Sequence, residues 1–127
     1  MTHKILLVDD SRTMLAVFRV YLMGGAYEFI DAESASRALD ILRLVTVDLI
    51  IADVNMPHMD GIAFVRRVRG SDRPHVRAVP IILVTSDKSE DLPARSADAH
   101  ADAFLTKPVE ADALARLVGR LLQGKPP

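Results

Sequence analysis

Three short segments of this chain are apolar at nearly every position and rich in β-branched residues: residues 4–8, 49–52 and 81–84. A strand with one face in water alternates apolar and polar side chains, whereas a parallel strand covered by helices on both faces reads as one apolar run. These segments therefore predict a parallel sheet enclosed between two layers of helices. This restricts the fold more than any other feature of the sequence.

Weaker strand signals lie at residues 28–30 and 103–105, and helical spacing fills the stretches between the strands. The last helix is the clearest. Its apolar residues recur at i, i+3, i+4, i+7 and i+8, namely Leu114, Leu117, Val118, Leu121 and Leu122. Strand and helix alternate five times, which predicts a doubly wound α/β domain with a five-stranded parallel sheet and helices on both faces.

The fourth helix has the weakest signal. Pro93 stands where the first turns should lie, and Leu92 is the only large apolar residue of the segment. Proline is tolerated in the first turn of a helix but breaks its interior. Pro93 therefore predicts a helix that begins late.

The length of 127 residues fits one domain with a single core. We expect this domain to span residues 1–123. Residues 124–127 are interpreted as a tail or the start of a linker, because a glycine suits the stop of the last helix and two prolines end the segment.

Composition excludes several classes of protein. The formal net charge is -1, so the chain as a whole attracts neither nucleic acid nor an anionic membrane. There are no cysteines, which excludes a disulfide framework, a thiolate zinc site and a cysteine nucleophile. The apolar runs are too short for a membrane span or a signal peptide, and we expect a soluble, cytoplasmic protein.

Polar residues stand at four of the predicted strand ends. Asp9 and Asp10 follow the first strand, Asp53 the third, Thr85 the fourth and Lys107 the fifth. Ligands of an open parallel sheet bind beyond the carboxyl ends of its strands. Three carboxylates gathered there repel one another unless they take up protons or bind a cation, and their hard oxygens suit Mg²⁺ or Mn²⁺. We therefore expect a divalent metal site at this edge.

A phosphoryl group fits such a site, because its transfer is mainly an electrostatic problem. The metal and Lys107 would neutralise its charge, and Asp53 would act as the nucleophile that forms an aspartyl phosphate.

Taken singly, each signal has a simpler interpretation. Asp9-Asp10-Ser11 and Asp60 could be helix caps, and Lys107-Pro108 could be a turn with proline at the first helical position. The coincidence of such signals at four strand ends favours the chemical interpretation.

Four motifs together resemble the response-regulator receiver domains of two-component signalling. They are Val8-Asp9-Asp10-Ser11, Asp53-Val54-Asn55-Met56-Pro57 followed by Asp60-Gly61, Val84-Thr85-Ser86, and Thr106-Lys107-Pro108. The resemblance runs from about Lys4 to Gln123. It implies a flavodoxin-like sheet with strand order 2-1-3-4-5, the order of the chemotaxis receiver CheY.

The resemblance also implies site roles. Asp53 accepts the phosphoryl group from the phosphohistidine of a histidine kinase or phosphotransfer protein. Asp10, Asp53 and the backbone carbonyl of Asn55 bind the metal, and Asp9 supports it through water. Such a domain is regulatory and catalyses only its own phosphorylation and slow dephosphorylation.

A conformational relay is part of the same resemblance. Lys107 and Thr85 contact the phosphoryl oxygens, Thr85 moves toward them, and Phe104 turns inward to fill the vacated space. The face of the fourth helix, fifth strand and fifth helix then changes. Asn55 and Asp87 flank the attacking water and modulate dephosphorylation.

Two departures from the receiver pattern bear on this relay. Ser86 stands after the switch threonine, where many receivers have alanine, and His100 replaces a glycine common before the fifth strand. If His100 ends the fourth helix, it must adopt the backbone conformation that glycine takes cheaply, or the helix must end differently.

Two alternatives remain open from the sequence. An aspartyl-phosphate hydrolase of the haloacid-dehalogenase type wants a second aspartate two residues after the nucleophile, where this chain has Asn55. A receiver-like binding module that responds to no phosphate would keep the same fold.

The implied partners are the phosphodonor and a downstream protein or output domain, with no direct nucleic-acid or membrane contact. A phosphorylation-dependent homodimer is one form that the output could take. The cluster of Arg66, Arg67, Arg69, Arg73 and Arg77 is interpreted as a solvated face.

Overall fold

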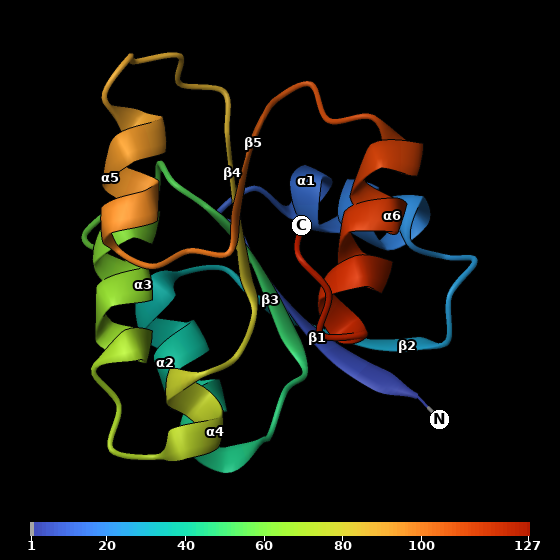
Figure 1. Cartoon of the computed structure of the whole chain (residues 1–127), viewed down its shortest axis with the longest axis horizontal. Coiled ribbons are helices and arrows are strands. Elements are labelled where there is room, and N and C mark those ends of the chain that lie inside the picture. Colours follow the sequence, from blue (N-terminus) through green and yellow to red (C-terminus); the bar gives the residue numbers. More distant parts are fainter. Residues whose placement is uncertain (1) are drawn as a thin grey trace.

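The computed structural model describes residues 2–127 and shows a five-stranded parallel sheet in the order β2-β1-β3-β4-β5 (Figure 1). The prediction of a doubly wound parallel sheet and the order implied by the resemblance are both confirmed. The strands are β1 (His3–Val8), β2 (Tyr27–Ala32), β3 (Leu49–Asp53), β4 (Ile81–Thr85) and β5 (Ala103–Thr106).

Helices cover both faces of the sheet. In Figure 1, α1 and α6 lie to the right of the strands, and α2, α3, α4 and α5 lie to the left. Residues 2–127 form six helices where five were expected, because the short helix α4 lies between α3 and β4. The helices are α1 (Arg12–Tyr21), α2 (Ala35–Leu44), α3 (Gly61–Arg69), α4 (Pro74–Arg77), α5 (Leu92–Asp98) and α6 (Ala111–Leu122).

The apolar strand segments serve two cores at once. In β3, Ile50 and Ala52 pack in the core under α2 and α3, while Leu49 and Ile51 pack in the core under α1 and α6. Successive side chains of a strand point to opposite faces. Both faces of β3 and β4 are buried, and this explains why their sequences show no alternation.

The weak fourth helix of the sequence is α5. It begins at Leu92, so Pro93 lies in its first turn, where it interrupts no helical hydrogen bond. The buried residues of this helix are Leu92 and Ser96, so its only large apolar residue packs into the core.

The interpretation of the arginine cluster as a solvated face is wrong for Arg69, although Arg66 and Arg67 are exposed. The Arg69 side chain is only 17% exposed and pairs with Asp102 at 2.8 Å. Its guanidinium also donates to three carbonyl oxygens, those of residues 77, 79 and 100. A planar group with five donors can satisfy several chain ends at once, and Arg69 thereby ties the end of α3 to the loops before β4 and β5.

No helix in the described part of the chain is long and apolar enough to cross a membrane.

His100 follows the end of α5 with a φ of 69°, in the left-handed region. Its backbone N–H donates to the carbonyl of Ala97, and the N–H of Ala101 donates to the carbonyl of Ser96. These bonds close the helix as a glycine would at this position. His100 therefore adopts the left-handed backbone conformation that was expected if it ends this helix. Unlike glycine, it does so with a Cβ.

Because the left-handed conformation costs a residue with a Cβ roughly 1–2 kcal/mol, we predict that His100→Gly is about 1 kcal/mol more stable than His100→Ala. Urea denaturation of the two variants measures this difference. Both variants remove the same exposed imidazole, so the loss of its contacts does not affect the difference between their stabilities. Equal stabilities would contradict the strain argument.

Candidate functional site

The polar residues at the strand ends meet at the carboxyl edge of the sheet. Asp9 and Asp10 follow β1, Asp53 ends β3, Thr85 ends β4 and Lys107 follows β5. The strands are parallel, so their carboxyl ends lie at the same edge of the sheet. Across the β3–β4 pair, for example, Asp53 lies opposite Val84, the residue before Thr85. The predicted convergence is confirmed for the three carboxylates and the Lys107 ammonium, and the backbone of Thr85 is hydrogen-bonded to that of Lys107.

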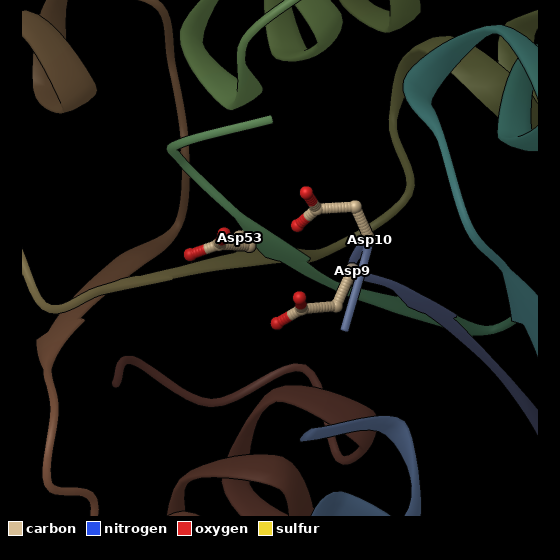
Figure 2. Close-up of side chains that lie close together, drawn as sticks. All are labelled: Asp9, Asp10 and Asp53. Atoms are coloured by element: carbon tan, nitrogen blue, oxygen red, sulfur yellow. The ribbon is translucent and has the colours of Figure 1, made fainter. Parts of the chain in front are cut away.

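The three carboxylates form a possible metal site. One oxygen from each of Asp9, Asp10 and Asp53 can be chosen so that all lie within 4.8 Å of one another (Figure 2). Asp9 and Asp53 are buried and Asp10 is exposed, so the group is open to solvent on one side. An all-oxygen set with an open side suits a hard divalent ion that keeps some of its waters, such as Mg²⁺ or Mn²⁺.

Lys107 faces the two buried carboxylates. Its Nζ lies 3.4 Å from Asp53 Oδ1 and 3.5 Å from Asp9 Oδ2. The backbone N–H of Lys107 donates to the carbonyl of Thr85 at 2.7 Å, which fixes the lysine beside the end of β4. Pro108 is not at the first position of α6, since that helix begins at Ala111, and the turn interpretation fails in that detail.

Burial disturbs the ionisation of both inner carboxylates. The pKa of Asp53 is raised to about 6, first by burial and then by the charge of Asp9, while Lys107 opposes the shift. Burial also raises the pKa of Asp9 against the opposing effects of the Ser11 N–H and Lys107. One ammonium group therefore does not compensate two buried carboxylates, and a second cation would be favoured.

Thr85 is held by two neighbours. Its Oγ1 accepts hydrogen bonds from Asn55 Nδ2 at 3.1 Å and from the backbone N–H of Asp87 at 3.0 Å. Both contacts use the oxygen as acceptor, so the hydroxyl hydrogen is free to point elsewhere. Asp87 is itself tied to Ser89, and hydrogen bonds from Ser89 lower the pKa of Asp87.

Phe104 lies on β5 opposite Leu83 of β4. Strand alternation puts Leu83 and Thr85 on the same face of the sheet, and Phe104 packs on that face against the core under α3 and α5. Phe104 is half-buried. The ring and the Thr85 hydroxyl therefore share one surface of the sheet, on adjacent strands.

Helix capping, the simpler interpretation of two of the motifs, is also observed. Ser11 caps α1 by accepting a hydrogen bond from the N–H of Met14, and Asp9 Oδ1 accepts one from the N–H of Ser11. Asp60 caps α3, as the simpler interpretation predicted. The same turns therefore fix the backbone that presents the carboxylates.

Gly61 has a role that the sequence did not reveal. A Cβ at this position would lie 2.4 Å from the carbonyl oxygen of Asp53 and 2.8 Å from the Cα of Val54. The first turn of α3 therefore lies against the backbone of Asp53, and only glycine permits this approach. The Asp60-Gly61 pair in the motif was the available signal.

An apolar cavity of about 440 Å³ beside Lys107 was also missed. Met14, Val17 and Tyr21 of α1 form one wall, and Pro108 and Val109 form the other. The helical spacing of Met14 and Tyr21 indicated only an apolar face. The sequence near these residues does not show which part of that face other elements leave uncovered.

Comparison with known proteins gives one family. A profile of the response regulator receiver domain matches residues 5–119. The response regulator protein FleR of Pseudomonas aeruginosa is 36% identical over 127 residues, which is 100% of this chain. The chemotaxis protein CheY of the same organism is 30% identical over 121 residues, which cover 94% of this chain and 96% of CheY.

A solved structure agrees with these relatives. The signal receiver domain of a signal transduction histidine kinase from Syntrophus aciditrophicus has a TM-score of 0.87 and 38% identity, and the match covers 96% of this chain and 91% of that one. The present chain spans only 26% of FleR but nearly all of CheY.

The raised pKa of Asp53 predicts a stability that depends on pH in metal-free solution. The folded pKa of about 6 exceeds the unfolded value of 3.8, so the folded state holds this proton more tightly. Protonation of Asp53 therefore contributes to folding stability. This contribution is fully present below the unfolded pKa and is lost as the pH rises through the folded pKa. Asp53→Asn removes this loss, and we expect the variant to be more stable than the wild type by about 1–3 kcal/mol at pH 7.5 with EDTA present.

Urea denaturation from pH 4 to pH 8 measures the effect. The stability difference should grow between pH 4 and pH 6 and stay constant above. Asp72→Asn is the matched control, because Asp72 is exposed and its replacement should change stability by less than about 0.5 kcal/mol. A variant less stable than the wild type at pH 7.5 would show that burial does not penalise the Asp53 charge.

Proposed function

Because this chain belongs to the response regulator receiver domain family of two-component signalling, we propose that it is a switch controlled by phosphorylation of Asp53. One observation carries the proposal: the Asp53 carboxylate is buried between two further carboxylates and the ammonium of Lys107. A nucleophile, a cation site and a fixed positive charge are the parts that phosphoryl transfer to a carboxylate requires.

The proposed reaction begins with an ionised Asp53. With a pKa of about 6, the carboxylate is mostly ionised at neutral pH and is a competent nucleophile. One carboxylate oxygen attacks the phosphorus, an Oδ–P bond forms, and the N–P bond of the donor phosphohistidine breaks. The bonding electrons leave with the imidazole, which takes up a proton.

The neighbouring residues bind and orient the phosphoryl group. Lys107 neutralises one phosphoryl oxygen, and the free hydroxyl hydrogen of Thr85 is donated to another. Asp10, Asp53 and the Asn55 carbonyl would hold Mg²⁺ or Mn²⁺, with Asp9 acting through water. When bound, the ion supplies the positive charge that polarises the phosphoryl oxygens.

We propose that Thr85 and Phe104 pass the change to the surface of α5, β5 and α6. The two residues share one face of the sheet, and Thr85 must give up its contacts with Asn55 and the Asp87 N–H to approach a phosphoryl group. Moving a population from 1:99 to 99:1 takes about 5.5 kcal/mol of differential stabilisation. We propose that the contacts of a doubly charged phosphoryl group with Lys107, the metal and Thr85 supply this free energy.

The proposed partners follow from the same role. A histidine kinase or phosphotransfer protein supplies the phosphoryl group, and a downstream protein or output domain receives the signal. The apolar cavity beside Lys107 favours a protein donor, because an apolar helix face could cover it during transfer. Asn55 and Asp87 both contact Thr85 Oγ1, and we propose that they modulate hydrolysis of the aspartyl phosphate.

The hydrolase alternative ranks lower. Its general acid would have to be Asn55, and an amide neither gives up nor recovers a proton at neutral pH. The phosphate-independent binding module differs from the switch in one measurable property, namely the response to a phosphoryl group or its mimic.

Acetyl phosphate labelling tests the phosphoacceptor. With radiolabelled acetyl phosphate and Mg²⁺ we expect covalent label on the wild type, and at least a tenfold loss with Asp53→Asn or with EDTA. Asp60→Asn is the matched control, because asparagine also caps helices and Asp60 lies outside the carboxylate group; its labelling should persist. Full labelling of Asp53→Asn would refute the site.

A beryllofluoride titration followed by amide NMR tests the switch. With Mg²⁺ present we expect resonance shifts at Thr85, Phe104 and Lys107 and on the exposed side of α5, and we expect none in Asp53→Asn. Shifts confined to Asp53 and its immediate neighbours would favour the phosphate-independent binding module.

A further inference from the structure

A second cavity, of about 160 Å³, lies between α2, α3 and α4, which are adjacent in Figure 1. It is far from the carboxylates. Helix α3 begins at Gly61, against the Asp53 backbone, and ends at Arg69, which bonds the carbonyl of Val79 just before β4 begins. The cavity is therefore at the amino edge of the sheet, and the phosphorylation site is at the carboxyl edge.

The inner wall of this cavity is apolar. It is formed by Leu39 and Leu42 of α2, Val68 of α3 and Val76 of α4. Pockets for drug-sized ligands and cofactors measure roughly 300–1,000 Å³. A hollow of about half the lower limit holds one apolar side chain rather than a whole small molecule.

The rim of the cavity is basic. Arg43, Arg67 and Arg73 line it, and Asp40 pairs with Arg43 at 3.1 Å. Among residues 2–127, no carboxylate lies within ion-pairing distance of Arg67 or Arg73. Two uncompensated positive charges therefore flank an apolar hollow, on a chain whose formal net charge is -1.

Arg73 is held in place before any ligand arrives. Its Nη1 donates to the carbonyls of Leu42 and Arg43 at 3.3 and 2.8 Å, at the end of α2. Only part of the guanidinium fork is used by these two bonds, and the remaining N–H groups can donate to a carboxylate. A fixed arginine loses less conformational entropy on binding than a free one.

We propose that this arginine-rimmed cavity binds an acidic peptide segment of a partner protein, with one apolar side chain in the cavity and flanking carboxylates on Arg67 and Arg73. The site requires neither Asp53 nor a metal ion, so it operates independently of the proposed phosphorylation. A second protein could thereby attach at the amino edge while the carboxyl edge is phosphorylated.

The dimensions favour a peptide over other anions. Nucleic acid binds through a row of phosphates spread along a basic surface, and an anionic membrane needs a broad basic or apolar face. Here two arginines that have no carboxylate partner among residues 2–127 flank a single hollow. A peptide with an apolar side chain next to carboxylates matches both the apolar cavity and its arginine rim.

The test is an amide NMR titration of the full chain with a capped pentapeptide in which leucine is flanked on each side by two glutamates, without Mg²⁺. We expect shifts at Val68, Ser71 and Val76 and none around Asp53. A peptide with glycine in place of the leucine keeps the charge and loses the apolar anchor, and it should bind at least fivefold more weakly.

Two charge reversals are compared. Arg67→Glu should weaken binding of the leucine peptide at least tenfold, and Arg116→Glu on α6 should leave it unchanged within twofold. Both arginines are exposed on helices, so neither reversal should disturb the fold, and both change the net charge equally.

Several outcomes would overturn the proposal. They are equal binding of the leucine and glycine peptides, equal weakening by both reversals, or no shifts up to millimolar peptide. Tighter, Arg67-dependent binding of phosphatidylglycerol vesicles or of a short oligonucleotide would assign the surface to a membrane or a nucleic acid instead. Labelling of Asp53 is unaffected by any of these results.

Discussion

The carboxyl edge of this sheet holds two buried carboxylates and one ammonium group, and this imbalance of charge underlies the chemistry of the molecule. Asp9 and Asp53 share Lys107 at 3.5 and 3.4 Å, and burial leaves the Asp53 pKa near 6. A site with surplus negative charge and one open side favours uptake of a cation. The bound cation would in turn favour a phosphoryl group, which carries further negative charge.

The rest of the fold keeps these charges from moving apart. β1 and β3 are adjacent parallel strands with apolar cores on both faces, and a close-packed interior permits little displacement of their ends. Gly61 brings α3 against the Asp53 backbone, and Ser11 holds the turn that follows Asp9. The electrostatic cost at the edge is offset by apolar burial elsewhere.

The two edges of the sheet differ in their use of charge. At the carboxyl edge the acids lie near one another with too few cations. At the amino edge Arg69 and Arg73 satisfy backbone carbonyls at the ends of helices and loops, and Arg67 has no carboxylate partner among the described residues. A chain of nearly zero net charge thus presents an acidic site and a basic cavity at opposite ends.

Local periodicity determined much of this protein. The apolar runs of β3 and β4, the stripe of α6 and the polar residues at the strand ends could be read from the sequence, because each depends on neighbours within a few positions. Parallel pairing then obliges Asp9, Asp53 and Lys107 to meet, so most of the candidate site was predictable as well.

Only the tertiary structure decided the remaining features. Arg69 resembles its exposed neighbours in sequence, yet its side chain is mostly shielded from solvent, because carbonyls from residues 77, 79 and 100 converge on it. The raised pKa of Asp53 and the cavities beside Lys107 and Arg73 likewise arise between segments distant in the chain. Burial and cavity shape are sums over such non-local contacts, and no window of the sequence contains them.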